Sequence, residues 1–469
     1  MASHHRLTRE TPDSRSGASC ENRAAAADPA RRARSDLDND ALHRRDPRAQ
    51  DARSPLLRRA GKELLSLALM DARNQTLRWL SVYEATLADG HWRVPMQPEL
   101  NPPLWEIGHI GWFQEHWIGR HVQRQRGTAC DPTGIRLASI EPHADAWYDP
   151  ARVPHERRWL LDLPGLQRTK DYLAATLEIT LDLLDATDTD GADPDAVLYF
   201  HRLALFHEDR LCERLATMAQ TLGLPLRESA NGLPGPHELL PTWPPHGSAA
   251  QRPPLTFAPT RWTPGLARGD GFVFDNEVSA HEIALPEFEI DAQAVTWAQY
   301  VDFVEDGGYD DAQWWSAEGW QWVQRKARRV PRHVAHLRQG VLQRRFGDLV
   351  HLPLQQPVAH VSWYEAEAWC RWAGRRLPAE VEWEAAAHQG ASRGFRWGDV
   401  WEWTASTFRP YPGFSPDPDR HYSEPCFGTH KVLRGASFAT AGRLRHPKYR
   451  HFLRPERDDG FAGFRSCAV

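Results

Sequence analysis

The sequence predicts a multidomain protein of mixed α and α+β class, in which a four-helix bundle precedes an α+β domain. Four segments between residues 56 and 230 repeat apolar residues at spacings of three and four, as amphipathic helices do. A Pro-rich stretch over residues 231–265 ends this periodicity and is predicted to link the two parts. Residues 266–469 hold short segments rich in Gly, Pro and Trp, which are typical of an α+β domain.

The N-terminal residues 1–55 precede the first helical pattern. They are rich in Arg, Asp, Ala and Ser and poor in large apolar residues, so we expect a disordered tail. An interaction arm is the alternative interpretation, but Asp residues interleave with the Arg residues throughout the segment.

Local start and stop signals bound the four helices of the bundle. Asp193 is the N-cap candidate of the fourth helix, because its side chain can accept from a backbone N–H of the first turn. Gly223 suits the left-handed conformation that ends many helices. In the α+β domain the clearest helix runs from Ser362 to Gly374. The predicted bundle helices cover residues 56–83, 103–117, 169–184 and 194–222.

Composition limits the classes of function. The formal net charge is -5 and the basic residues are scattered, so we expect no nucleic-acid partner. The sequence shows neither an apolar run that could span a membrane nor a secretory signal, and we expect a cytoplasmic protein without a membrane partner. None of the 6 cysteines forms a CxxC pair, which argues against a zinc cage and suits a reducing compartment.

Two histidines are the metal-ligand candidates of the bundle. His109 and His207 lie on different predicted helices among apolar neighbours, and metal sites in bundles use side chains from facing helices. Two buried histidines satisfied by hydrogen bonds are the alternative. The stretch HEDRLCE, which starts at His207, would become HxxxHxE with a histidine at its fifth position, placing two imidazoles one turn apart. Leu211 occupies that position, so the predicted site has two nitrogens and lacks a third ligand.

The α+β domain carries motifs that resemble a known fold. The run PVAHVSWYEAEAWCRWAGRRLPAEVEWEAAA over residues 357–387 is similar to the formylglycine-generating-enzyme, or sulfatase-modifying-factor, domain, as are GDVWEWTAS, VLRGASF and FAGFR. The segment VTWAQYVDFVEDGGY resembles the opening helix of that domain. The resemblance implies a C-type-lectin-like fold over 266–469. RGASFATAGRLRHPKYR lacks the cysteines of that family's copper site, so we do not expect formylglycine formation.

The bundle and this domain together resemble the ergothioneine-synthase family of hercynine oxygenases. PPLWEIGHIGWFQEHW is similar to the family's first-histidine segment, which makes His109 a metal ligand, and HEDRLCE matches the second motif through His207. The resemblance implies a DinB-like four-helix bundle over residues 56–230 and Fe(II) as cofactor. It also implies that the substrates are hercynine (the trimethylated form of histidine), a sulfur or selenium donor, and O2.

Within the family the likeness is greatest to the selenoneine-synthase branch. The phrases ELNPPLWEIGHIGWFQE, LYFHRLALFHED and WGDVWEWTASTFRPYPGF carry it. His451, Phe452 and Leu453 fall where ergothioneine synthases carry Asn, Trp and the acidic residue that holds the amino-acid part of the thiol. We therefore predict C–Se bond formation between hercynine and a selenosugar. The alternatives are C–S bond formation with a thiol donor and a degenerate, non-catalytic homologue, which Leu211 and His451 favour.

The resemblance also implies roles for further residues. Arg158 would hold the donor, and Tyr411 would be catalytic as the proton donor to the oxygen intermediate. The quaternary ammonium of the substrate would lie against four aromatic side chains, those of Trp401, Trp403, His451 and Phe452. The alternatives are a solvated Arg158, core positions for the two tryptophans, and a Tyr411 that packs on its neighbouring prolines.

Overall fold

The computed structural model describes residues 53–469, apart from 227–231, 243–250, 270 and 338–339. The predicted tail therefore falls almost wholly outside the described residues. The described residues belong to one compact unit of the chain.

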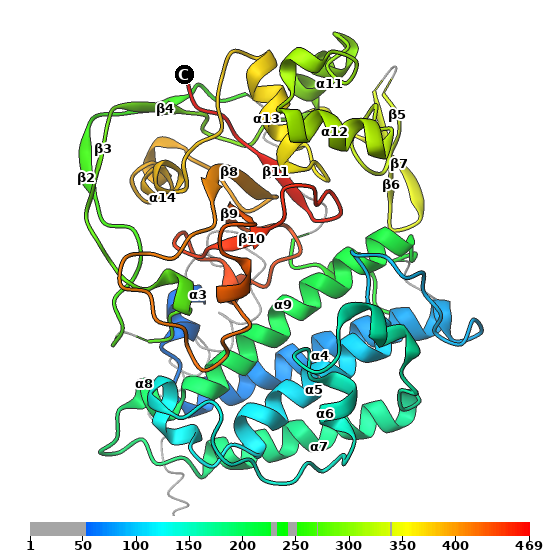
Figure 1. Cartoon of the computed structure of the whole chain (residues 1–469), viewed down its shortest axis with the longest axis vertical. Helices are drawn as coiled ribbons and strands as arrows, with labels where there is room; N and C mark the ends of the chain where they lie inside the picture. The colour runs from blue at the N-terminus through cyan, green and yellow to red at the C-terminus, as the bar shows by residue number, and fades with distance from the viewer. Residues whose placement is uncertain (1–52, 227–231, 243–250, 270, 338–339) are drawn as a thin grey trace, which may run out of the picture. The chain divides into compact units, whose positions relative to one another are not determined.

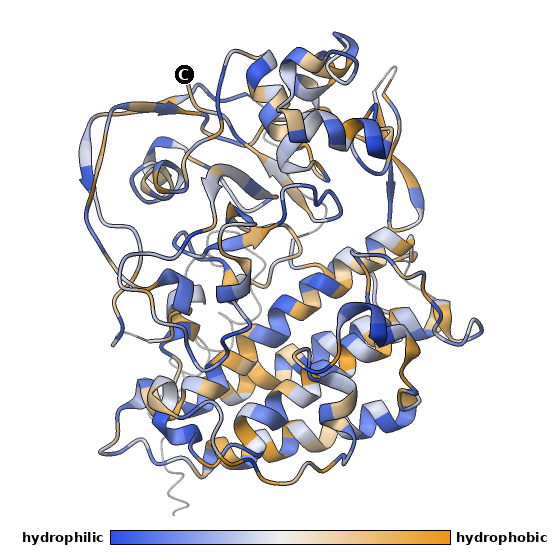
Figure 2. Ribbon diagram, in the orientation of Figure 1, coloured by the Kyte–Doolittle hydropathy of each residue, from blue (hydrophilic) through white to orange (hydrophobic). Residues whose placement is uncertain are grey.

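Four long helices pack against one another in the first half of the described chain. In this helical half α4 contacts α9 and α7, and α5 contacts α7 and α9 (Figure 1). Apolar stretches lie where α4, α5 and α9 meet (Figure 2). The four helices predicted from periodicity are confirmed as helices. Their bounds are α4 (Lys62–Leu87), α5 (Pro103–Gln114), α7 (Leu166–Asp185) and α9 (Tyr199–Leu222).

The ends of these helices show why the sequence folds this way. Asp193 accepts a hydrogen bond from the Asp195 backbone N–H and caps α8 (Pro194–Val197), which precedes α9. Gly223 ends α9 with φ of 70°, as expected for a glycine cap. Three predicted helices are interrupted. α3 (Arg53–Arg58) is separate from α4, α5 continues into a π-helical turn over Glu115–Gly119, and the predicted fourth helix is divided into α8 and α9.

Part of the predicted linker is folded. Short helix α10 (Pro236–Leu239) and strands β1 (Leu255–Phe257) and β2 (Thr260–Trp262) lie within residues 231–265. β1 pairs antiparallel with β4 (Phe288–Ile290), and β2 pairs with β3 (Ile283–Leu285). These strands have three residues each, and surrounding prolines hide their alternation in the sequence. The C-terminal strands thus begin before residue 266.

The C-terminal half is built on a four-stranded sheet of order β10-β9-β8-β11. β8 pairs antiparallel with β9 and parallel with β11, and β9 pairs antiparallel with β10. The strands are β8 (Trp401–Thr407), β9 (Lys431–Gly435), β10 (His451–Leu453) and β11 (Ala462–Phe464).

Helices and a second sheet flank this central sheet. A three-stranded antiparallel sheet comprises β5 (Val334–His336), β6 (Val341–Arg345) and β7 (Asp348–Leu352). The helix predicted from Ser362 is confirmed, with the Ser362 hydroxyl accepting from the Glu365 N–H. The helices of this half are α11 (Trp297–Glu305), α12 (Ala317–Lys326), α13 (Trp363–Trp372) and α14 (Glu380–Gln389).

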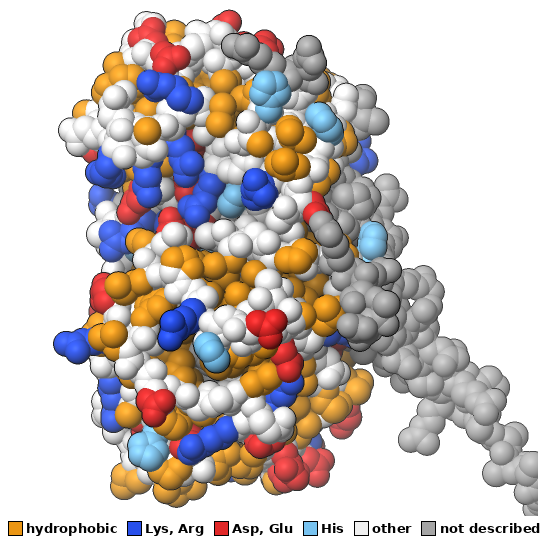
Figure 3. All heavy atoms as spheres, turned by 90° about the vertical axis from the view of Figure 1, so that its right-hand side faces the viewer, with side chains coloured by type: hydrophobic (Ala, Val, Ile, Leu, Met, Phe, Trp, Pro, Cys, Tyr) orange, Lys and Arg blue, Asp and Glu red, His pale blue; other side chains and the backbone are white. Residues whose placement is uncertain are grey.

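Helix α9 runs beside the C-terminal half (Figure 1). Arg443 binds Asp209 of α9 through two hydrogen bonds, and Trp401 of β8 donates to Glu213. On the surface seen in Figure 3, acidic and basic side chains are interspersed with apolar ones. No helix among the described residues is both long enough and apolar enough to cross a membrane.

Candidate metal and substrate site

The structure brings His109 and His207 together from facing helices. The centres of the two imidazole rings, one on α5 and one on α9, are 5.1 Å apart. Phe113, one turn after His109, stacks on His207 with ring centres 3.6 Å apart and so fixes its plane. Only 8% of His109 and 9% of His207 is exposed. The helix pattern thus places two imidazoles at one point, as a shared site requires.

The orientation of His109 leaves one ring nitrogen free. Its Nδ1 lies 2.9 Å from the carbonyl oxygen of Tyr148, the last residue of short helix α6 (Ala144–Tyr148). Because a carbonyl oxygen can only accept, Nδ1 carries the hydrogen and Nε2 keeps its lone pair. Trp105 stacks on the ring with centres 5.1 Å apart. Metal-binding histidines are commonly held in this way by a carbonyl on the second nitrogen.

Both imidazoles are neutral at physiological pH. Burial lowers the pKa of His109 to about 4, against a smaller opposing effect of the Glu106 carboxylate. The pKa of His207 lies well below its ordinary value, first because of burial and then because of the neighbouring His109 and Arg210. Neutral imidazoles offer their lone pairs, which is the protonation state that a metal ligand needs.

Two cavities adjoin α9. The larger, of about 540 Å³, contains His109 and His207 and is called the histidine cavity here. The smaller, of about 190 Å³, is lined by Trp401, Tyr449 and His451 and is called the aromatic cavity. Arg210 lines both. Together they place the two imidazoles next to an aromatic surface.

The aromatic cavity suits a cationic group. The ring of Trp401 lies 4.7 Å from that of His451 and 5.7 Å from that of Tyr449. Burial, and to a lesser extent Arg210, lowers the pKa of His451 to about 3, so this ring brings no positive charge. Aromatic faces attract cations, and a carboxylate, that of Glu213, lines the same cavity. The two predicted substrate-binding residues Trp401 and His451 therefore lie together.

Leu211 and Glu213 do not serve a metal directly. Leu211 lines the aromatic cavity and packs on an apolar cluster that combines residues of the helical half with Phe346, Phe438 and Phe461. The Glu213 carboxylate accepts from Trp401 Nε1 at 2.7 Å, Ser437 Oγ at 2.5 Å and Thr440 Oγ1 at 2.8 Å. Its oxygens are thus committed to joining α9 to the C-terminal strands.

No third side-chain ligand accompanies the two imidazoles among the described residues. There, the one group of three or more His, Cys, Asp or Glu side chains close enough to share a metal comprises Glu99, Asp458 and Asp459. Arg332 pairs with the first two, at 3.1 and 2.9 Å, and Arg457 pairs with the third at 2.5 Å. This group is a compensated ion-pair network, and it does not include either imidazole.

Trp403 and Phe452 line neither cavity. Trp403 is fully buried and donates its Nε1–H to the Val361 carbonyl at 2.9 Å, so it belongs to the core. Phe452 stacks on Phe408 with ring centres 4.2 Å apart. Alternation along a strand explains the difference for Phe452, because its neighbours His451 and Leu453 face the aromatic cavity.

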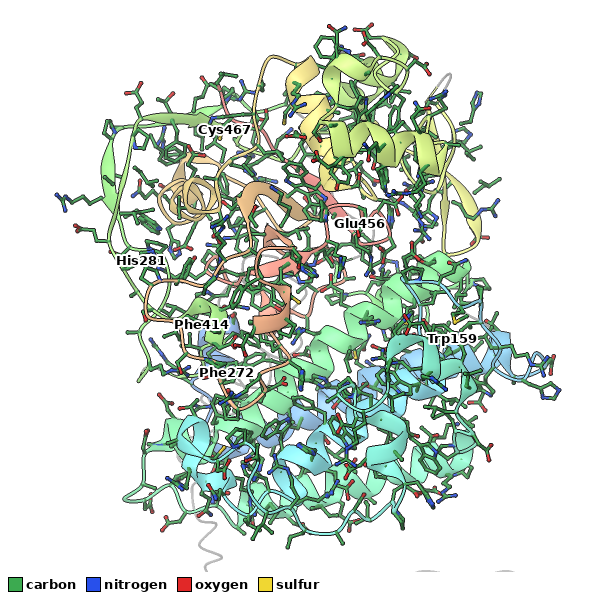
Figure 4. All side chains as sticks on the ribbon, in the orientation of Figure 1. Trp159, Phe272, His281, Phe414, Glu456 and Cys467 are labelled. Atoms are coloured by element: carbon green, nitrogen blue, oxygen red, sulfur yellow. The ribbon has the colours of Figure 1, made fainter. Side chains whose placement is uncertain are left out.

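Arg158 reaches His109 through an intervening ring. Its guanidinium lies 3.7 Å from the centre of Trp105, which in turn stacks on His109, and it donates to Asn101 Oδ1 at 2.9 Å. Burial lowers its pKa to about 10. Arg158 is not a solvated surface arginine, yet it lines neither cavity. Trp159, the next residue, lies where α4 ends (Figure 4).

Tyr411 also lines neither cavity. The Arg450 guanidinium lies 4.0 Å from the centre of its ring, and the His281 ring is 4.9 Å away. His281 is labelled at the edge of the C-terminal half, away from the long helices (Figure 4). The tyrosine that lines the histidine cavity is Tyr422, whose hydroxyl lies 3.3 Å from that of Tyr449.

Sequence reasoning missed four residues of the site. Arg210 had a usable signal, since it lies three residues after His207 and hence on a neighbouring position of the same helix face. The other three come from loops whose position only the folded chain decides. They are Asp419, Tyr422 and Tyr449.

Comparison with known proteins agrees with this architecture. The family model of the sulfatase-modifying factor enzyme 1-like domain matches residues 260–399 and 396–468. A hercynine oxygenase of Mycobacterium tuberculosis is 32% identical over 453 residues, covering 86% of this chain and 98% of that protein. One of Mycolicibacterium smegmatis is 31% identical over 465 residues, with coverages of 86% and 98%. A formylglycine-generating enzyme of Streptomyces coelicolor is 30% identical over 283 residues, covering 44% of this chain and 85% of that protein.

Proposed function

The chain belongs to the hercynine oxygenase family, and we propose that it forms a carbon–selenium bond between hercynine and a selenosugar, using Fe(II) and O2. One observation carries the proposal: His109 and His207 meet in a cavity that shares Arg210 with a second, aromatic cavity. This arrangement offers separate places for the imidazole and for the quaternary ammonium of hercynine.

The two imidazoles fit Fe(II) as ligands, but they supply two nitrogens and not three. His109 offers Nε2, because its Nδ1 is engaged with the Tyr148 carbonyl, and His207 presents a neutral ring to the same cavity. Leu211 stands where a third nitrogen would be expected, so water and substrates would fill the remaining positions. When bound, Fe(II) supplies oxygen activation and lowers the pKa of the donor's selenol.

The aromatic cavity is the proposed place of the trimethylammonium group. Trp401 and Tyr449 provide ring faces, and the neutral His451 adds a third ring without a competing charge. Desolvated contacts between a quaternary ammonium and aromatic faces contribute about 2 kcal/mol. Held there, hercynine would extend its imidazole toward His207.

The choice of a selenosugar rests on Leu453. This residue lines the aromatic cavity at the position where the resemblance expects an acid for the amino group of a thiol donor. The nearby acidic side chains are engaged, Asp459 with Arg457 and Glu99 with Arg332. A neutral sugar needs no such partner. A thiol donor remains the alternative within the same mechanism.

The residues of the chain bind, orient and exchange protons. The reaction breaks the C–H bond of the imidazole carbon and the Se–H bond of the donor and forms C–Se, and two electrons and two protons pass to O2. Arg158 would position the ring of Trp105 against His109. Tyr422, which lines the histidine cavity and pairs with Tyr449, replaces Tyr411 as the proposed proton donor.

Three further predictions from the sequence stay proposals. We propose that the helical half is DinB-like, on the basis of its four packed helices. The domain division at residues 231–265 is proposed with the modification that β1 and β2 belong to the C-terminal domain. A cytoplasmic location is supported by the five described cysteines, all of which are free thiols.

A second candidate is a binding protein without catalysis. Leu211 favours it, since a site with two imidazoles holds iron less firmly than one with three. In that case the aromatic cavity would still bind hercynine.

A donor panel tests the proposal. Protein loaded anaerobically with Fe(II) is mixed with hercynine, air and selenoglucose, thioglucose, cysteine or γ-glutamylcysteine, and products are read by mass spectrometry. We expect the selenium adduct to dominate. A dominant sulfur adduct would support ergothioneine-type chemistry, and no adduct from folded protein would support the binding candidate.

A further inference from the structure

Arg210 is a cation without a charged partner at the wall of both cavities. Among the described residues its guanidinium forms no ion pair or hydrogen bond, and its recorded contact is with the Tyr422 ring, 4.2 Å from the centre. Asp419 lines the histidine cavity with it, and the negative charge of that carboxylate acts on Arg210 without forming an ion pair. The Arg210 side chain is half-buried, and a guanidinium in such a place costs free energy unless an anion lies against it.

The neighbouring arginines differ in this respect. Arg214, which lines the aromatic cavity, pairs with Glu106 at 3.0 Å. Arg457, in the same lining, pairs with Asp459 at 2.5 Å, and Arg443 pairs with Asp209 at 2.6 Å. Among the three arginines that line the aromatic cavity, Arg210 is therefore the one without a carboxylate partner.

Stacking prepares the guanidinium for an anion. A guanidinium that lies on an aromatic face keeps its N–H groups directed outward, in the plane where a carboxylate can accept two of them. Tyr422 provides that face on the side of the histidine cavity. The N–H groups then remain for a ligand at the wall between the two cavities.

The position along α9 selects which anion this is. Arg210 follows His207 by three residues, so it lies about one turn further along the same side of the helix. In hercynine the carbon that bears the trimethylammonium group also bears a carboxylate, one methylene away from the imidazole. With the imidazole near His207 and the ammonium near Trp401, the carboxylate falls at the wall that Arg210 shares.

We propose that Arg210 binds the substrate carboxylate and makes the site selective for a trimethylated amino acid over the corresponding amine. This inference rests on the proposed function for the identity of the substrate. Arg210, which precedes Leu211, would thus have a role in substrate binding that requires no metal.

Ligand binding to the metal-free full chain tests the inference. The probes are hercynine and trimethylhistamine, which is hercynine without its carboxylate, and tryptophan fluorescence or calorimetry gives each Kd. Arg210→Gln should weaken hercynine binding about 10- to 100-fold, as expected for a charged hydrogen-bonded pair, and change trimethylhistamine binding less than about 3-fold. Arg210→Lys should fall between wild type and Arg210→Gln. The matched control Arg214→Gln should leave the ratio of the two affinities unchanged.

Competition on the wild-type protein gives a measurement that does not depend on a variant folding. Acetate should compete with hercynine and not with trimethylhistamine. Equal weakening of both ligands by Arg210→Gln, no weakening of either, or equal competition by acetate overturns the inference and leaves the proposed function standing. If wild-type protein binds neither ligand, the proposed function and the inference fail together.

Discussion

Trp401 of β8 donates its indole N–H to the carboxylate of Glu213 on α9 at 2.7 Å. This bond joins a ring of the aromatic cavity to the helix that carries His207. Ser437 and Thr440 complete the hydrogen bonds of the same carboxylate. The position of the proposed ammonium pocket relative to the proposed metal ligands therefore depends on Glu213.

Glu213→Ala should destabilise the protein. Removing the carboxylate leaves three buried donors without their acceptor, and each such loss costs about 1–3 kcal/mol, partly recovered by relaxation. We expect the free energy of unfolding, measured by urea denaturation, to fall by about 2–4 kcal/mol. Glu213→Gln, which keeps one acceptor oxygen, should lose less. An unchanged midpoint for Glu213→Ala would contradict the role of this residue as a joint.

His207→Ala should abolish metal binding. Wild-type protein exposed anaerobically to Fe(II) should retain about one iron per chain, and the variant should retain almost none, because one imidazole alone binds weakly. His116→Ala is the matched control: it lines the same cavity, but its Nε2 accepts from Arg136. Full iron retention by His207→Ala would disprove the site.

A histidine at position 211 should restore the missing ligand, and an Fe(II) titration can measure the gain in affinity. Leu211→His should tighten iron binding at least about 10-fold, since it adds an imidazole one helical turn from His207. Leu211→Gln controls for polarity at this position. Equal affinity in wild type and Leu211→His would mean that another ligand already completes the site.

Trp401→Leu should weaken hercynine binding about 3- to 30-fold, the range expected for one lost ring face under a cation. Calorimetry on metal-free protein measures this without requiring turnover. Phe452→Leu is the control, because Phe452 lines neither cavity and stacks on Phe408. A larger effect at Phe452 than at Trp401 would place the ammonium elsewhere.

Tyr422→Phe should lower the rate of product formation at least about 10-fold, a contribution typical of a positioned proton donor. Tyr411→Phe should leave the rate within about 2-fold of wild type, since Tyr411 lines neither cavity. Single-turnover mass spectrometry compares the two. The reverse order would restore Tyr411 as the catalytic tyrosine.

His451 should make stability depend on pH. Its pKa is lowered in the folded state to about 3, so between pH 6.5 and 3 the unfolded chain binds the proton more readily. Its contribution to stability is therefore complete above pH 6.5 and is lost as the pH falls. Between pH 8 and 5 wild type should lose about 1–2 kcal/mol more than His451→Gln, as measured by urea denaturation at each pH. Parallel losses would contradict this.

Local signals in the sequence explain what could be predicted. The spacing of apolar residues, the Asp193 cap and the glycine at 223 specify the long helices within a few residues. His109 and His207 followed from this, because residues on the inner faces of packed helices must meet. The helical spacing also showed that Leu211 stands where a second histidine of the same helix face would be expected.

Contacts between distant segments explain what could not be predicted. Tyr422 and Tyr449 reach the cavities from loops, and a periodicity argument says nothing of where a loop lies. Tyr411 and Trp403 are residue types that suit a catalytic or binding role, but neither lines a cavity. Their surroundings depend on distant partners, Arg450 for Tyr411 and Val361 for Trp403. β1 and β2 are too short to be recognised without the strands they pair with.

One helix carries a metal-ligand candidate, a cation shared by both cavities and the joint to the C-terminal strands, at His207, Arg210 and Glu213. These three positions are spaced by the rise and turn of α9 alone, about 1.5 Å and 100° per residue. A one-residue insertion between them would swing the joint away from Trp401, whereas loops elsewhere can lengthen without disturbing the spacing. An insertion or deletion between His207 and Glu213 would therefore separate the metal-ligand candidate from the aromatic cavity, so this stretch of seven residues should keep its length.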